Sequence, residues 1–204
     1  TFARLDFLPI FLARGWLRAS FGAPLPHVTQ QSPDVAEVDV DLPIEPGLQY
    51  RTKDFTFAGF NVLSPQQLIH EPAGQIANEV QLQKDVAALK DFYESRGYLK
   101  AHVSAAPQFD DSAATVVFAL QAEEGSQYRM GEFEVEGVEK SAAARLVDAW
   151  TLRAGEPYDR TYLKRYSAQL SRVYPHIEEM KATMEETPDE STHAVDVLLR
   201  CTPK

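Results

Sequence analysis

Two short motifs recur along this chain with a long, regular spacing, and that spacing limits how the chain can fold. The pattern Gly-x-Gln-Tyr-Arg at residues 47–51, followed by Phe-x-Phe-x-Gly at 55–59, returns 78 positions later at 125–129 and 133–137 with Val replacing the second Phe. An Arg-Gly-aromatic-Leu motif at residues 14–17 returns 82 positions later at 96–99. Periodicity of this kind is typical of small structural units in tandem, so we expect a chain of repeats.

The motifs divide the 204 residues into two and a half units. We predict the C-terminal half of a domain at 1–46, a complete domain at 47–124 and another domain at 125–204. A hydrophobic fraction of 44% with 25% charged residues is that of ordinary folded domains. Because the first segment carries only the last part of a unit, we expect the chain to belong to a longer protein.

The charge balance excludes several partner classes. The formal net charge is −10 and is spread along the chain, without the basic surplus that binding to phosphates requires. An anionic membrane surface would also repel the chain. No stretch has the roughly 18 consecutive apolar residues that indicate a membrane-spanning helix. Nucleic acid is therefore not an expected partner.

The middle unit shows how one repeat is built. Alternating apolar and polar residues predict a strand over 50–57, and Ser64-Pro65 predicts the start of a short helix. A second helix is expected to begin after Asn78, with Asp159 as its counterpart in the last unit, and to carry an apolar stripe at positions 82, 86, 89 and 93. Gly97 is placed to end it in a left-handed conformation. Two further strands follow, with apolar faces at 99–103 and 116–120. The second of these faces recurs at Val38, Val40 and Leu42 in the first unit and at Val195, Val197 and Leu199 in the last. The predicted order is strand, helix, helix, strand, strand, with both helices on one face of the sheet.

No residues are arranged for catalysis or for binding a metal or cofactor. The five histidines have no pairing at helical spacing and no cysteine partners. The neighbouring acids Asp110-Asp111 and Glu123-Glu124 lie in predicted turns, where solvated turn residues are the favoured interpretation. The single cysteine, Cys201, is in phase with the apolar face of a predicted strand and is interpreted as a buried structural thiol. The chain is not expected to be an enzyme.

With this unit order and these motifs, the chain resembles tandem POTRA (polypeptide-transport-associated) domains of the BamA/TamA-like surface antigen family. The resemblance covers nearly the whole chain, and the middle unit matches best. The last unit departs where residues 174–177, Tyr-Pro-His-Ile, replace the Arg-Gly-Tyr-Leu corner. The resemblance implies an α+β fold, with each β-α-α-β-β repeat forming a three-stranded mixed sheet covered on one face by two antiparallel helices.

The resemblance also implies a location and partners. These are the periplasmic face of the Gram-negative outer membrane, unfolded outer-membrane client polypeptides, periplasmic accessory proteins and a C-terminal β-barrel of the same parent chain. In the family the second strand lies at the edge of the sheet. Carried onto this sequence, the partner-binding edges are Tyr98, Leu99, Lys100, Ala101, His102, Val103 and Ser104 in the middle unit, and Trp16, Leu17, Arg18, Ala19, Ser20 and Phe21 in the first.

Two functional hypotheses remain open. In the leading one the units are binding scaffolds for outer-membrane protein assembly or translocation. Clients would pair with the exposed edges by β-augmentation, which depends little on client sequence because main-chain groups make the bonds. In the alternative the units are rigid spacers that orient a β-barrel and bind no client themselves, which the short links between units favour.

Overall fold

The computed structural model describes residues 6–32 and 35–204. Close packing groups the chain into two compact units. The first comprises Thr1–Ala58, Ser64–Ala87 and Ser104–Gln121, and the second comprises Gly59–Leu63, Ala88–Val103 and Ala122–Lys204. None of the helices in the described part combines the length and hydropathy needed to cross a membrane.

The sheet of the middle repeat has three strands. They are β5 (Arg51–Ala58), β6 (His102–Asp110) and β7 (Thr115–Glu123), in the order β5-β7-β6. β5 runs parallel to β7, with a register shift between Thr52 and Asp54. The central strand, β7, buries every second residue, which is the alternation expected for a sheet with one covered face. The sheet is mixed and β6 lies at its edge, as expected.

The two helical segments of the middle repeat differ greatly in length. The long helix α2 spans Glu79–Glu94 and buries Leu82, Leu89 and Tyr93 from its predicted apolar stripe. Asn78 caps its N-terminus, accepting a hydrogen bond from the Gln81 backbone N–H at 3.0 Å. The first helix is reduced to a single 3₁₀ turn, η2 (Pro65–Gln67).

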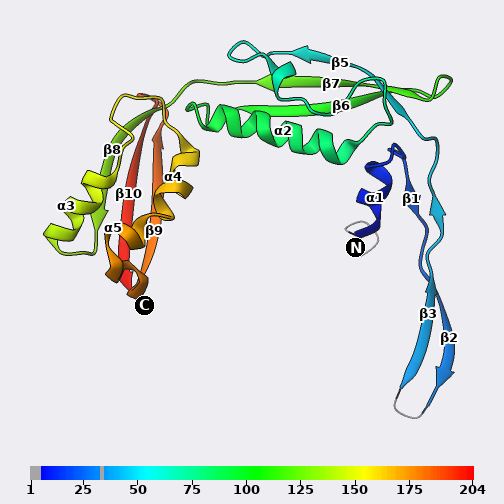
Figure 1. Ribbon diagram of the computed structural model, residues 1–204, viewed down its shortest axis with the longest axis horizontal. Coiled ribbons are helices and arrows are strands. Elements are labelled where there is room, and N and C mark those ends of the chain that lie inside the picture. Colours follow the sequence, from blue (N-terminus) through cyan, green and yellow to red (C-terminus); the bar gives the residue numbers. More distant parts are fainter. Residues whose placement is uncertain (1–5, 33–34) are drawn as a thin grey trace. The chain divides into compact units, whose positions relative to one another are not determined.

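The last repeat forms a second three-stranded mixed sheet. Its strands are β8 (Arg129–Glu136), β9 (Met180–Asp189) and β10 (Ala194–Pro203), in the order β8-β10-β9. β10 is parallel to β8 and antiparallel to β9. The helices α3 (Lys140–Ala149), α4 (Arg160–Ser167) and α5 (Leu170–Val173) lie beside this sheet (Figure 1) and bury Leu146, Tyr166 and Leu170 against β10.

Two sequence features of the last repeat have clear structural outcomes. The expected second helix is divided into α4 and α5, and the sequence 174–177 leads into a 3₁₀ helix, η3 (Pro175–Glu179), before β9. Cys201 is buried in the core of β10, and burial raises the pKa of its thiol. The interpretation of Cys201 as a structural thiol is therefore confirmed.

The first segment contains helix α1 (Leu8–Leu12) and four short strands. β1 (Ser20–Phe21) pairs with β4 (Ile44–Glu45), and β2 (Leu25–Gln31) pairs antiparallel with β3 (Ala36–Asp41). Every described residue of β2 and β3 is exposed, including those expected to form an apolar core face. Pro24 lies between β1 and β2, and Pro43 lies between β3 and β4. Since proline cannot donate to a strand ladder, both prolines separate the two pairs of strands.

Candidate partner-binding edges and repeat joints

The predicted edge of the middle repeat is partly a turn. Residues 98–101 form a turn in which the Ala101 N–H donates to the Tyr98 carbonyl at 3.1 Å, and β6 begins only at His102. The expectation of a strand from Tyr98 is therefore wrong for Tyr98, Leu99, Lys100 and Ala101. The alternation of apolar residues continued through this turn, so periodicity alone placed the strand start too early.

The part of the predicted edge that does lie in a strand is His102 to Ser104, and β6 extends it to Asp110. Along an edge strand, alternate residues direct their backbone N–H and C=O groups outward. Pro107 interrupts this row, and proline is tolerated in an edge strand where its nitrogen faces away from the ladder. By this alternation Val103 and Ala105 share the outward phase of Pro107.

The predicted edge of the first repeat is mostly engaged inside the fold. Residues 16–19 form a turn closed by the Ala19 N–H and the Trp16 carbonyl, so only Ser20 and Phe21 belong to a strand. The rings of Trp16 and Phe21 both contact the ring of Phe11 edge-on, each with a centroid distance of 5.8 Å. The expected edge strand from Trp16 to Phe21 is therefore wrong for Trp16, Leu17, Arg18 and Ala19.

The two recurring motifs contact each other at two places, called joints here. Residues 14–17 contact residues 47–51 in the first joint, and residues 96–99 contact residues 125–129 in the second. In the second joint, the Tyr128 N–H donates to the Gly97 carbonyl at 2.7 Å, and the Gln127 side chain donates to the Arg96 carbonyl at 2.9 Å. Gly97 has φ of +85°, and a Cβ there would lie 2.2 Å from the Tyr128 carbonyl oxygen. Position 97 therefore requires glycine for two reasons: its φ is positive, and the Tyr128 carbonyl oxygen leaves no room for a Cβ. The first joint has the same bonds, from Tyr50 to Gly15 and from Gln49 to Arg14.

Each joint also holds a buried tyrosine whose hydroxyl donates a hydrogen bond to a carboxylate. The Tyr128 hydroxyl donates to Glu190 at 2.8 Å, and this bond raises the pKa of Tyr128. Lys100 forms an ion pair with Glu190, and hydrogen bonding to Lys100 lowers the pKa of the carboxyl. The first joint repeats the arrangement with Tyr50, Asp111 and Arg18. Lys100 is therefore part of a joint.

Two of the neighbouring acids interpreted as solvated turn residues have specific partners. Asp111 accepts the Tyr50 hydroxyl at 2.7 Å. Glu124 accepts the Tyr93 hydroxyl at 2.7 Å and the backbone N–H groups of Asn61 and Val62. Partial burial acts to raise the pKa of Glu124, but these hydrogen bonds outweigh it and the pKa is lowered. The signal that could have identified Asp111 is its spacing of 79 positions from Glu190, one more than the 78 that separate Tyr50 from Tyr128.

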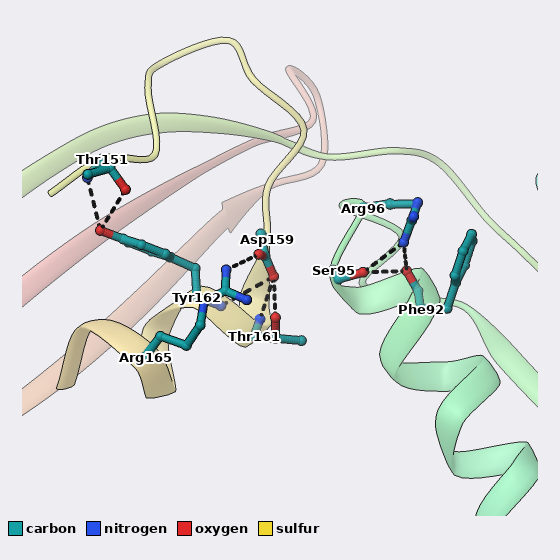
Figure 2. Close-up of polar contacts among 8 residues, drawn as sticks. All are labelled: Phe92, Ser95, Arg96, Thr151, Asp159, Thr161, Tyr162 and Arg165. Atoms are coloured by element: carbon teal, nitrogen blue, oxygen red, sulfur yellow. Dashed lines mark hydrogen bonds and ion pairs between the residues drawn. The ribbon is translucent and has the colours of Figure 1, made fainter. Parts of the chain in front are cut away.

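The second compact unit also contains the start of α4, where Asp159 caps the helix (Figure 2). Its carboxylate accepts from the Thr161 N–H at 2.9 Å and the Tyr162 N–H at 3.2 Å, which confirms the predicted cap. Arg165 donates to the other carboxylate oxygen. These groups stabilise the helix end, and in the described part of the chain no three His, Cys, Asp or Glu side chains gather as a metal site would require.

Comparison with known proteins finds a family match for the middle repeat and relatives of similar fold for most of the chain. The family model for POTRA, surface antigen variable number repeat, matches residues 50–125. The outer membrane protein assembly factor BamA of Neisseria meningitidis serogroup B is 24% identical over 212 residues, covering 95% of this chain and 26% of the relative. The chain therefore spans about a quarter of the length of the curated relative that it matches.

Solved structures agree on the fold. The crystal structure of Haemophilus influenzae BamA POTRA3-5 superposes with a TM-score of 0.69 at 20% identity, covering 95% of this chain and 76% of that one. BamA from Haemophilus ducreyi lacking POTRA domains 1–3 gives a TM-score of 0.64 at 19% identity, covering 76% of this chain and 30% of that one. With the repeated joints and mixed sheets, these matches show that the chain has the fold of tandem POTRA domains, and residues 50–125 match the POTRA family model itself.

Proposed function

We propose that this chain is a periplasmic, non-enzymatic scaffold of an outer-membrane protein assembly or translocation factor. It would bind unfolded outer-membrane client polypeptides or periplasmic accessory proteins, next to a C-terminal β-barrel in the same parent protein. The name of the Neisseria relative, an outer membrane protein assembly factor, supports this role. We also propose the repeat division 1–46, 47–124 and 125–204, which the joints at Tyr50 and Tyr128 support.

The observation that carries the binding proposal is the position of β6 at the edge of its sheet. The strand order β5-β7-β6 leaves the outer side of β6 without a neighbouring strand in its own sheet. The strand runs for nine residues, His102–Asp110, so its row of main-chain groups is long enough to pair with an extended peptide. Pro107 limits the pairing to the N-terminal half of the strand, which is where the predicted residues His102, Val103 and Ser104 lie.

The test is the substitution Ala105→Pro, in the outward phase of Pro107. Loss of an outward N–H removes one donor and places a ring where a client strand would lie, so the Kd for an extended peptide should rise by about tenfold or more. The fold should persist because no ladder bond is lost. The measurement is a titration with a peptide copied from an outer-membrane barrel strand, followed by backbone amide shifts.

The matched control is Ala105→Ser, which keeps the N–H and should bind the peptide as the unmodified protein does. Shifts of the amides from His102 to Ala106 that disappear only in the proline variant would support pairing at this edge. Equal affinity of the proline and serine variants would exclude pairing at β6 as the mechanism.

The alternative role, a rigid spacer that binds no client, is favoured by the two joints. Each joint combines a main-chain bond, a side-chain amide bond and a tyrosine–acid contact, which leaves few free rotations between the motifs that it connects. This proposal predicts that small-angle scattering of the chain fits one conformation, unchanged across moderate salt. A profile that requires a broad ensemble of conformations would contradict it.

A further inference from the structure

The last repeat has an edge strand of its own, β9. In the order β8-β10-β9 it lies at one edge of its sheet (Figure 1), and it pairs with β10 along its whole length of ten residues without a register shift. Its one proline, Pro188, is the last residue but one, whereas Pro107 divides β6 near its middle. The uninterrupted part of the edge is therefore longer in β9 than in β6.

Two residues show in which direction the main-chain groups of β9 point. The Met180 N–H donates to the Ile177 carbonyl in η3, so it faces away from β10. Pro188 has no N–H, and proline is tolerated in an edge strand where its nitrogen faces away from the ladder. Both occupy even positions, and in an antiparallel pair alternate residues direct their N–H groups outward. The residues between them in the same outward phase are Ala182, Met184 and Glu186.

An open hollow of about 440 Å³ lies beside this edge. One wall consists of partly exposed side chains of β9, and the facing wall includes Ser167 at the end of α4 and Ser171 in α5. Leu199 of β10 also lines it, together with Leu170 and Ile177. The side chains from β9 are Met180, Ala182 and Met184. Since most of the lining comes from β9 and the helical segments that face it, the hollow lies along the edge of the sheet.

The lining also contains one charged pair, where β9 begins. Lys204 Nζ donates to the backbone carbonyl of Glu178 in η3. The rest of the hollow is lined by apolar side chains and by the two serine hydroxyls. An uncharged, mainly apolar segment is therefore the kind of occupant that fits most of its length.

Small side chains on the helical wall leave this space. The buried Leu170 lies 81 positions after the buried Leu89 of α2, so the same offset relates the two serines to residues of the middle repeat. Those residues are Val86 and Lys90, both larger than serine. The two serines are exposed and lie four residues apart in the sequence. The last repeat therefore combines a long open edge with short side chains on the helices that face it.

The two faces of β9 differ in chemistry. The inner face is apolar along the hollow and ends at Glu186, which accepts the Tyr158 hydroxyl at 2.6 Å. On the outer face Thr183 and Glu185 are exposed, and Glu185 pairs with Arg200 at 3.2 Å. Side chains alternate between the faces of a sheet, so a strand added beside β9 would continue both faces. Every second side chain of that strand would enter the hollow, and the others would lie on the polar face.

We propose that β9 and this hollow bind an extended segment in which apolar side chains recur at every second residue. The inference rests on the proposed client-binding function and adds a sequence requirement that main-chain pairing alone lacks. The segment would accept hydrogen bonds from the outward N–H groups of β9 and place alternate side chains between Met184 and Ser171. Methionine adapts to different apolar shapes, so the hollow would select the spacing of the apolar residues more than their type. Strands of transmembrane β-barrels have this alternation, which makes them the substrate class that fits.

The test titrates the whole chain with two peptides of identical composition. In the spaced peptide a leucine and a phenylalanine are separated by one threonine, and in the adjacent peptide they are neighbours; the other residues are threonines, with a lysine at each end. The spaced peptide should give saturable shifts of the backbone amides from Ala182 to Glu186. In the adjacent peptide the two apolar side chains face opposite ways and only one can enter the hollow, so its Kd should be about tenfold higher or more.

Two variants separate the hollow from the strand edge. Ser171→Trp fills the hollow from the helical wall and leaves the main chain of β9 unchanged, so the Kd of the spaced peptide should rise by about tenfold or more. Gln169→Trp is the matched control, because it adds the same ring at an exposed position outside the lining. It should bind the spaced peptide as the unmodified protein does.

Each outcome decides for or against the inference. A preference for the spaced peptide that is lost in S171W and kept in Q169W supports it. Equal Kd values for the two peptides, or an unchanged Kd in S171W, overturn it. Shifts confined to residues 102–106 also overturn it but leave the proposed pairing at β6 intact, whereas a lack of shifts in both strands contradicts both proposals. If S171W does not fold, the comparison of the two peptides on the unmodified protein still gives the answer.

Discussion

Replacing Gly97 by alanine is expected to destabilise the chain by more than about 3 kcal/mol. Gly97 has φ of +85°, where a side chain alone costs about 1–2 kcal/mol. The added Cβ would also lie 2.2 Å from the Tyr128 carbonyl oxygen and 3.2 Å from the Tyr158 nitrogen. Both atoms belong to backbone that is fixed by hydrogen bonds, since the Tyr158 N–H donates to the Tyr128 carbonyl at 3.0 Å. The clash can be relieved only by opening the joint.

Gly155→Ala is the matched control for this prediction. Gly155 has φ of +83°, so alanine meets the same backbone strain there, but no atom lies within 4 Å of the added Cβ. It should cost only about 1–2 kcal/mol. The measurement is denaturant unfolding followed by circular dichroism, with thermal midpoints as a check. For a chain of this size the difference corresponds to several degrees in midpoint. Equal losses for the two variants would show that the contact between Gly97 and Tyr128 contributes no stability.

The repeat made the main elements of the fold predictable, because local chemistry decides them. Asn78 and Asp159 cap helices since their side chains reach the free N–H groups of the first turn. Gly97 ends α2 because it adopts a left-handed conformation without strain. The alternation along β7 and β10 identified the central strands. In each case the deciding interaction lies within a few residues of the one named.

The candidate edges were less predictable because long-range contacts set their bounds. Lys100 is in phase with a strand, yet it is held in a turn and pairs with Glu190, 90 residues away in the sequence. Trp16 and Phe21 are likewise held by Phe11 rather than extended in one strand. A periodic pattern records which face a residue prefers, but it does not record the partner that ends a strand.

The burial of Asp85 was missed for a related reason. Val86 was the expected core residue at its turn of α2, but Asp85 is buried and Val86 is only half-buried. An aspartate at a helix position is normally solvated, so its burial becomes visible only when the loop N–H groups of His70 and Glu71 are seen to meet it. Tyr166 lies 81 positions after Asp85, as the helix cap Asp159 lies 81 positions after Asn78, and it is also buried, so the position itself belongs to the core.

Replacing Asp85 by leucine should lower the free energy of unfolding by about 3–5 kcal/mol. The change removes the acceptor of two backbone N–H groups, from His70 and Glu71, and of the Gln81 side-chain amide. Those donors stay buried or half-buried without a partner, which is the costly state for a hydrogen-bonding group. Asp91→Leu, at an exposed position of the same helix, is the control and should change stability by about 0.5 kcal/mol or less.

Urea unfolding of both variants measures the difference. A loss in the Asp85 variant no greater than in the Asp91 variant would mean that the bonds of Asp85 contribute nothing to stability. The expected large loss would come from the donors left without Asp85. Leu152 and Tyr166, each 81 positions after Glu71 and Asp85, show that the last repeat forms its core without acids at these positions.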